Sequence, residues 1–328
     1  MTLFKEIRGN SFDNWIDSKK LLMKKYSVSS RSESYKIKKF CWSCNGKLGS
    51  SNWFDSLGSN LVKCEKCGLI QSEYIPSEEI LGELYNDKLY NDFYDEHVLK
   101  NHNKRKEAFG RERVKDWLKY YGKEKPTRVL EIGCGSGFTL SAAKDKGLDV
   151  YGLELSNKCV EFCNDLGLKN VFKKELSEFV NQTNQKFDVI ALYDVLEHMP
   201  DPLTTIRDIK KIMNKDGLLT FYVPNADSFI INTLDSSATQ WVWQPFHLSY
   251  FNKKSLGYLL NSQGFSEVYS DTVGMDIFDI ANFIKQEKDI KSITLDSETM
   301  WKAQKAIQST IDSLGVGSIL RYFCRLNS

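Results

Sequence analysis

Four of the eight cysteines form two close pairs, and their spacing is typical of a metal site. Cys41 and Cys44 are separated by two residues, nineteen residues follow, and Cys64 and Cys67 repeat the first spacing. Each pair forms a tight knuckle that directs two thiolates toward one tetrahedral ion, and four protein ligands leave no position for water. The sequence therefore predicts a structural Zn site. We expect a cytoplasmic protein, and a reducing cytoplasm favours a metal over disulfides.

A second motif is the glycine-rich segment VLEIGCGSG, residues 129–137. An apolar strand runs into Gly133, Gly135 and Gly137, and a helix follows at once. Glycine permits a tight turn and lets a ligand approach the backbone with no Cβ in the way. Twenty-one residues after Gly133, a second strand ends in Glu154, where a carboxylate can accept both ribose hydroxyls of an adenosine. These residues predict a site for an adenosine-containing cofactor.

Two features distinguish this loop from that of a dinucleotide oxidoreductase. Its spacing is G-x-G-x-G rather than G-x-G-x-x-G, and the carboxylate of Glu131 lies just before it. A negative charge there disfavours a pyrophosphate but suits a cofactor with a cationic amino group and a sulfonium. The segment from Arg128 to Leu155 resembles motif I of class I methyltransferases, which use S-adenosylmethionine and release S-adenosylhomocysteine.

The resemblance implies a role for each residue of this segment. The three glycines would line the methionine part of the cofactor, Glu154 would hold the ribose, and Glu131 would support the loop. An acidic residue after the third strand contacts the adenine amine in these enzymes, and Glu175 is the matching residue here. The expected cofactor-binding residues are Glu131, Gly133, Cys134, Gly135, Gly137, Glu154, Leu155, Glu175 and Tyr193.

A third motif, FDVIALYDVLEHMPDP over residues 187–202, resembles the segment after the fourth strand in ubiquinone-biosynthesis O-methyltransferases and many sugar methyltransferases. Ligands of open α/β sheets bind at the carboxyl edge of the strands, so Asp194, Glu197 and His198 are expected beside the methyl group. Histidine suits a general base because its ordinary pKa is about 6.5. Three hypotheses stay open: this group deprotonates the acceptor, it only holds the loop, or Glu197 and His198 bind a divalent metal.

The segment WVWQPFHLSYFNKKSLGYLLNSQGF resembles the tail of sugar and polysaccharide methyltransferases. His247 in this segment is a second candidate for general base or substrate ligand, and Trp241 and Trp243 are candidates for stacking on a sugar ring. The alternative for these residues is packing in an aromatic core. Enzymes that methylate exocyclic amines of bases carry an N/D-P-P-Y/F element after the fourth strand, and its replacement by Tyr193–Leu196 argues against that chemistry.

The segments around these motifs indicate how the motifs are positioned. From Arg128 onward strands alternate with helices, which predicts βαβ units and a parallel sheet. The expected fold class is α/β, a Rossmann-like, doubly wound and mostly parallel sheet with a small zinc-ribbon domain before it. The predicted domains are an N-terminal extension (1–40), the zinc-ribbon module (41–75), a helical connector or lid (76–126), the class I methyltransferase domain (127–275) and a C-terminal helical segment (276–328).

The cysteine module and the residues after it resemble the N-terminal region of deoxysugar C-methyltransferases, which continues into a tyrosine-rich lid. The matching lid residues are Tyr85, Tyr90, Phe93, Tyr94 and His97, and the alternative is an amphipathic packing helix. Those enzymes carry a further C-terminal domain that has no counterpart in this sequence. We therefore expect methylation of oxygen rather than carbon.

The composition of the chain limits the classes of partner that the protein is expected to bind. The net charge is +2 and no apolar run reaches the ~18 residues that a membrane span needs, so neither nucleic acid nor a membrane is expected as a partner. The main hypothesis is O-methylation of a sugar, nucleotide-sugar or surface-glycan precursor. Two alternatives stay open: an rRNA or tRNA methyltransferase that holds RNA with its ribbon, and a non-catalytic partner protein. The sequence does not indicate the oligomeric state.

Overall fold

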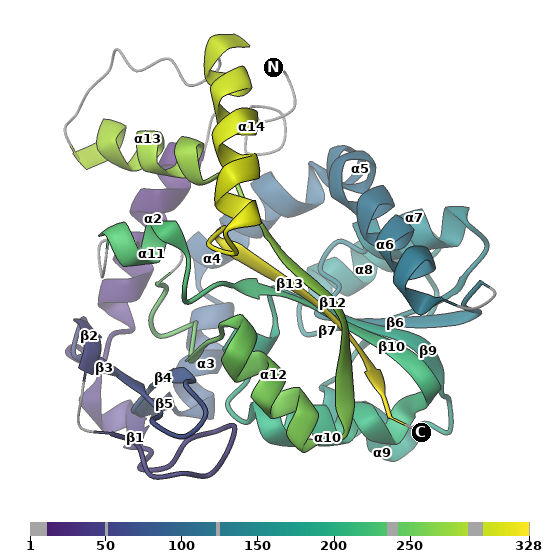
Figure 1. Ribbon diagram of the computed structural model, residues 1–328, viewed down its shortest axis with the longest axis horizontal. Helices are drawn as coiled ribbons and strands as arrows, with labels where there is room; N and C mark the ends of the chain where they lie inside the picture. The colour runs from purple at the N-terminus through teal and green to yellow at the C-terminus, as the bar shows by residue number, and fades with distance from the viewer. Residues whose placement is uncertain (1–11, 50–51, 123–124, 235–241, 288–297, 328) are drawn as a thin grey trace.

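A seven-stranded sheet lies at the centre of the computed structural model, which describes residues 12–49, 52–122, 125–234, 242–287 and 298–327 (Figure 1). The strands lie side by side in the order β12 (Phe265–Val273), β13 (Ile319–Leu326), β10 (Met213–Pro224), β9 (Phe187–Tyr193), β6 (Arg128–Ile132), β7 (Asp149–Glu154) and β8 (Val171–Lys173). The strands from β10 to β8 pair in parallel, and β13 runs antiparallel to both of its neighbours. The predicted doubly wound, mostly parallel sheet is confirmed.

Helices cover both faces of this sheet, which is why its central strands are apolar along most of their length. On one face, α9 (Leu176–Gln182), α10 (Pro202–Ile212) and α12 (Lys253–Ser262) contribute to one apolar cluster. On the other face, α6 (Arg111–Tyr121) and α7 (Phe138–Asp145) contribute to a second. The helix α8 (Asn157–Asp165) follows β7, and Cys163 in it joins the second cluster.

The connector before the sheet is a run of short helices that ends in α6. It comprises α3 (Glu78–Tyr85), α4 (Lys88–Phe93), the π-helical turn η2 (Tyr94–Leu99), α5 (His102–Arg105) and a second π-helical turn η3 (Lys106–Gly110). A Cβ on Gly110 would lie 2.8 Å from the Phe138 carbonyl oxygen, so η3 packs closely on α7. The side chains of Phe93, Tyr94 and His97, three of the expected lid residues, lie outside those that the structure describes.

The N-terminal region contains α2 (Phe12–Lys25), the 3-10 turn η1 (Ser32–Ser34) and five short strands. They are β1 (Tyr35–Ile37), β2 (Asn52–Ser56), β3 (Ser59–Lys63), β4 (Ile70–Ser72) and β5 (Tyr74–Pro76). A four-stranded sheet has the order β11, β4, β3, β2, and its β11 (Ser249–Tyr250) comes from the methyltransferase half of the chain. The cysteine region therefore shares a sheet with a segment almost 180 residues later in the sequence.

The C-terminal region is not purely helical, which corrects the prediction for residues 276–328. The helices α13 (Asp276–Glu287) and α14 (Glu298–Ser313) are followed by β13, which inserts between β10 and β12 (Figure 1). The strand carries Arg321 and Arg325, so its sequence lacks the continuous apolar run of a central strand. Its antiparallel pairing with β10 and β12, rather than its own sequence pattern, stabilises this segment as a strand.

Two short elements complete the described fold: the 3-10 turn η4 (Leu196–His198) after β9 and the helix α11 (Phe229–Leu234) after β10. Among the described residues, we find no helix with the length and apolar character that crossing a membrane requires.

Candidate functional site

The glycine loop connects β6 to α7 at the carboxyl edge of the sheet. Gly133, Gly135 and Gly137 all adopt positive φ, at 69°, 53° and 67°. The N–H groups of Gly133 and Cys134 donate to the Leu153 carbonyl at 2.8 and 3.1 Å, which fastens the loop to β7. This left-handed backbone is the reason for glycine at all three places.

Glu154 at the end of β7 faces this loop. One of its carboxylate oxygens accepts the N–H of Gly135 at 2.8 Å, and the other accepts those of Leu155 and Ser156 at 2.8 and 2.9 Å. The carboxylate is therefore held by the backbone beside the glycines, where a ribose would bind. Leu155 next to it leaves 53% of its surface exposed, so an apolar side chain is available beside the same place.

Glu131 lies beneath the loop and is only 2% exposed. Burial raises the pKa of its carboxyl to about 7, against the opposing effect of Arg113, whose guanidinium lies 3.8 Å from one carboxylate oxygen. The other oxygen has no hydrogen-bond partner within the described residues. A buried carboxyl with an unpaired oxygen can accept a hydrogen bond from a cationic ligand amine.

The other expected cofactor residues lie at the same edge with different surroundings. The Cys134 thiol is buried beside Cys163. The neighbouring thiol and the burial both raise the pKa of Cys134. The hydroxyl of Tyr193 accepts a hydrogen bond from the Trp117 indole, so its ring packs on the face covered by α6. Glu175 is exposed at the start of α9, just after β8. The cofactor roles of these residues remain predictions.

The connector contributes contacts to the glycine loop that the sequence analysis missed. The Nδ1 atom of His102 in α5 lies 2.9 Å from the Ser136 carbonyl oxygen, and His102 is only 5% exposed. Val98 in η2 would lie 3.9 Å from a Cβ on Gly135. These contacts join segments 34 or more residues apart, and no local pattern marks them.

Asp194 follows β9 at the same edge and adopts a φ of 56°, which is uncommon for a residue with a side chain. Its N–H donates to the Tyr222 carbonyl at 2.9 Å, and its side chain is exposed. The next residue, Val195, contacts the glycine loop so closely that a Cβ on Gly133 would lie 2.4 Å from a Val195 methyl. The two predicted motifs therefore lie side by side.

Glu197, His198 and His247 form a cluster, here called the acceptor cluster, in which one ligand atom of each lies within 4.8 Å of the others. Glu197 is 1% exposed, both its carboxylate oxygens lack a partner within the described residues, and burial raises its pKa well above the usual range. His198 donates from Nδ1 to the Phe246 carbonyl at 2.8 Å, and burial lowers its pKa to about 4. This tautomer leaves the lone pair of Nε2 available to accept a proton or bind a metal.

An aromatic group surrounds the acceptor cluster. The Trp243 ring stacks on Phe246 at 3.9 Å, and the Lys19 amine from α2 lies 4.4 Å from the same ring. These contacts support core packing rather than sugar stacking for Trp243, while Trp241 lies outside the described residues. Lys19 is 6% exposed and burial lowers its pKa to about 7, so the N-terminal extension brings an amine close to His198.

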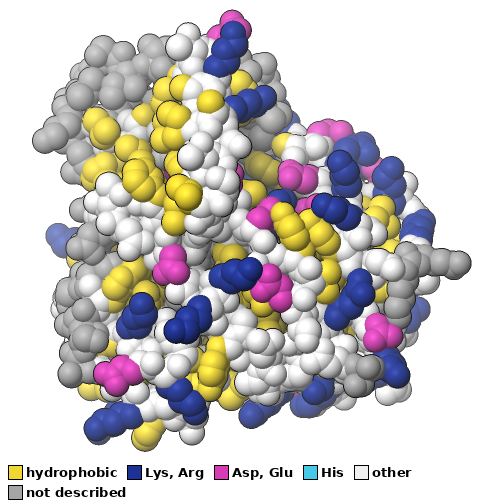
Figure 2. Space-filling view, viewed as in Figure 1, with side chains coloured by type: hydrophobic (Ala, Val, Ile, Leu, Met, Phe, Trp, Pro, Cys, Tyr) yellow, Lys and Arg dark blue, Asp and Glu magenta, His cyan; other side chains and the backbone are white. Residues whose placement is uncertain are grey.

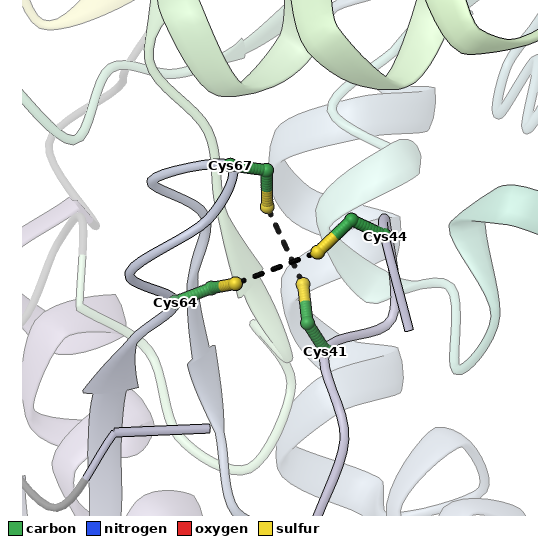
Figure 3. A group of neighbouring side chains, drawn as sticks. All are labelled: Cys41, Cys44, Cys64 and Cys67. Carbon is green, nitrogen blue, oxygen red and sulfur yellow. Dashed lines mark hydrogen bonds between the residues drawn. The ribbon is translucent and has the colours of Figure 1, made fainter. Parts of the chain in front are cut away.

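The four paired cysteines converge on one point, as Figure 3 shows. The sulfurs of Cys41 and Cys67 lie 3.4 Å apart and those of Cys44 and Cys64 lie 3.5 Å apart. Tetrahedral zinc with Zn–S bonds of about 2.3 Å would place its sulfurs about 3.8 Å apart, so the donor set fits the ion.

Backbone N–H groups also donate to these sulfurs, at 3.4 Å from Ser43 to Cys41 and from Gly46 to Cys44. Such donors favour thiolates, which are the form that binds zinc.

The order of strands, the glycine loop with Glu154 and the acceptor cluster together define a Rossmann-like methyltransferase of class I. Residues 105–270, half of the chain, match the sequence model of the family described as "Methyltransferase domain". The chain belongs to this family.

Comparisons with individual proteins agree with this family. The chain is 35% identical over 107 residues to a ubiquinone biosynthesis O-methyltransferase of Actinobacillus pleuropneumoniae serotype 5b (strain L20). The aligned region covers 30% of this chain and 46% of the relative. It is 29% identical over 103 residues to the enzyme of the same name from Bordetella avium (strain 197N), with 30% and 43% covered. The chain thus spans about half the length of the curated relatives it matches.

Solved structures resemble the chain over a longer stretch at lower identity. A SAM-dependent methyltransferase from Archaeoglobus fulgidus has a TM-score of 0.47 and 20% identity, over 70% of this chain and all of that one. The plantazolicin methyltransferase BpumL, in complex with a triazolic desmethylPZN analog and SAH, has a TM-score of 0.48 and 16% identity, over 75% of this chain and 94% of that one.

Proposed function

We propose that this protein transfers a methyl group from S-adenosylmethionine to a hydroxyl of a small acceptor, with a sugar, nucleotide-sugar or surface-glycan precursor as the acceptor class. One observation carries the proposal: the glycine loop packs against Val195, which lies two residues before Glu197 of the acceptor cluster, so the loop with Glu154 and the cluster are neighbours at one sheet edge. Both relatives described above are O-methyltransferases by name, which supports oxygen as the methylated atom. The sugar class rests on the motif that contains His247.

The chain's own residues divide the work. Glu154 would bind the ribose, Glu131 would face the amino group, and the glycines would let the cofactor lie against the backbone. When bound, S-adenosylmethionine supplies an electrophilic methyl group on sulfur. The imidazole of His247 would accept the proton of the acceptor hydroxyl, and the lowered pKa of the neighbouring His198 keeps that second ring neutral at physiological pH. Holding both reactants at one edge supplies orientation.

We further propose that the four-cysteine group holds zinc in a structural role, since its four thiolates complete the coordination. The ion would crosslink two knuckles of a region too small to build a large core of its own.

Label transfer from methyl-labelled S-adenosylmethionine tests the activity. The purified protein is incubated with cell extract separated into nucleotide-sugar and glycan, RNA, lipid and protein fractions, with Glu154→Ala as the control. Label in the sugar fraction that is lost in the control supports the proposal. Label in RNA would contradict the proposed sugar acceptor and make RNA the acceptor. Absence of transfer despite cofactor binding would contradict the proposed activity.

Divalent metal at the acceptor cluster is tested in the same assay, with the protein washed in a chelator that leaves the cysteine site loaded. Transfer that survives the wash supports a histidine base, whereas transfer that returns only with Mg²⁺ or Mn²⁺ assigns the cluster to a metal. The RNA alternative finds no support on the face in Figure 2, where lysines and arginines alternate with acidic side chains instead of forming a continuous basic stripe.

A further inference from the structure

The cysteine region is joined to the acceptor histidine by backbone hydrogen bonds. Strand β4 begins three residues after Cys67 and pairs with β11, which begins two residues after His247. The Ser72 N–H extends this pairing by donating to the Leu248 carbonyl at 2.9 Å. Strand β11 is only two residues long, so β4 is the template that fixes its place.

Buried side chains make a second connection between the same parts. The hydroxyl of Ser59 in β3 lies 2.9 Å from that of Ser72 and donates to the Gln244 side-chain oxygen at 3.1 Å. The amide nitrogen of Gln244 in turn donates to the carbonyl oxygen of His247 and, at 3.0 Å, to the Tyr250 hydroxyl. Ser59, Ser72 and Gln244 are each at most 2% exposed, so water does not compete for these bonds.

The same segment, residues 243–250, also holds the other two members of the acceptor cluster. The Leu248 N–H donates to the Glu197 carbonyl at 2.8 Å, and the Phe246 carbonyl accepts from the His198 ring. A displacement of this segment would therefore move His247 and release both of its neighbours. By contrast, the hydrogen bonds that hold the glycine loop run to β7, to Cys163 of α8 and to His102.

The β4 template depends on the cysteine knuckles. In the second knuckle, Cys64 donates its N–H to the carbonyl of Leu69, the residue just before β4, at 2.8 Å. In the first knuckle, Trp42 donates its N–H to the side chain of Gln71 in β4 at 2.9 Å. The buried cysteines and Trp42 belong to the large apolar cluster on one face of the central sheet, which includes Leu196 and Leu248, the sequence neighbours of Glu197 and His247.

We propose that the zinc-ribbon module is a positioning element of the acceptor site: the metal-closed knuckles hold β4, and β4 holds the segment that carries His247. The inference rests on the proposed function only where it treats His247 as a residue of the acceptor site. The hydrogen bonds that connect β4 to His247 do not depend on the reaction. The hydrogen bonds of the module thus run to the acceptor half of the site.

Histidine NMR on the full-length protein with ¹³C at imidazole Cε1 tests the proposal, with His198→Asn, His247→Asn and His102→Asn used for assignment. Zinc is removed with a chelator and then restored. We expect the His198 and His247 signals to shift on removal and return on restoration, while the His102 signal on the glycine loop stays. Unchanged His198 and His247 signals would overturn the proposal, and so would an equal shift of His102, which would report general unfolding.

Two serine variants of the ribbon sharpen the test without touching the cysteines. Ser59→Ala removes the bonds to Ser72 and Gln244, whereas Ser43→Ala removes a buried hydroxyl that has no hydrogen-bond partner within the described residues. We expect Ser59→Ala alone to shift the His247 signal, and equal effects of the two would contradict the proposal. If the coupling is present but the wild-type protein transfers no methyl group in the label assay, the proposed function fails and the positioning role stands.

Discussion

The two halves of the site are built in different ways. The cofactor half comes from one continuous stretch, residues 129–155, in which strand, loop, helix and strand follow each other and Glu154 bonds back to Gly135. The acceptor half joins residues 194–198 to 243–250 and depends on β4 of the cysteine region. Methyl transfer needs both halves, but a local fold suffices for the first and three distant segments are needed for the second.

The largest effect is expected from His247→Asn. Because general acid–base catalysis contributes about 10²- to 10⁴-fold, methyl transfer should fall by that factor while the affinity for S-adenosylmethionine stays within about twofold. Label transfer and calorimetry measure the two quantities. His102→Asn is the matched variant, since it replaces a buried histidine that contacts the glycine loop, and it should weaken the cofactor instead. Equal effects of both variants on transfer and on cofactor affinity would contradict the division of the site into two halves.

Glu154→Ala should produce the opposite pattern. Loss of a charge-assisted hydrogen bond costs about 1.5–3 kcal/mol, so the cofactor should bind about 10- to 100-fold more weakly. The carboxylate also accepts backbone N–H groups of the loop, and Glu154→Gln should therefore retain part of the affinity. Calorimetric titration with S-adenosylhomocysteine measures both, and wild-type affinity in the alanine variant would contradict the role of Glu154.

Gly133→Ala tests the contact between the halves. The new methyl would meet Val195 at 2.4 Å in a left-handed backbone, and strain with overpacking should destabilise the fold by about 2 kcal/mol or more. Removing the clash with a second substitution, Val195→Ala, should recover part of this loss. Urea unfolding of the single and double variants measures it, and additive effects would show that the two loops are independent.

A further prediction concerns the pH dependence of Glu131. Its folded pKa of about 7 exceeds its usual value, so the folded state binds the extra proton and the stability of the protein declines as pH rises from about 4.5 to 7. Glu131→Gln removes this decline, and its stability relative to wild type should rise across the same interval. Thermal unfolding from pH 4.5 to 8 measures the difference, and a constant difference would refute the raised pKa.

The same contrast explains what the sequence could predict. The glycine loop, Glu154 and the cysteine pairs were predictable because their chemistry depends on residues close in sequence. Asp194, Glu197 and His198 follow a recognisable strand, so their place at the sheet edge was predictable as well. The structure confirms these placements, while the roles of the residues remain proposals.

The remaining features depend on pairings between distant segments. The approach of His247 to Glu197 requires β11 to pair with β4, which no periodicity within residues 242–250 reveals. The insertion of β13 into the sheet and the contact of His102 with Ser136 are of the same kind. The amine of Lys19 beside Trp243 comes from an N-terminal helix whose purpose the sequence left open.

The central claim is that cofactor binding and acceptor chemistry reside in separable halves at one sheet edge. Equilibrium dialysis of labelled S-adenosylmethionine against the double variant Glu197→Gln, His247→Asn tests it most directly, with Glu154→Ala in a parallel chamber. We predict wild-type retention of the label by the double variant and a loss of about tenfold or more in affinity for Glu154→Ala. Loss of binding in the double variant, or full binding by Glu154→Ala, would contradict the claim.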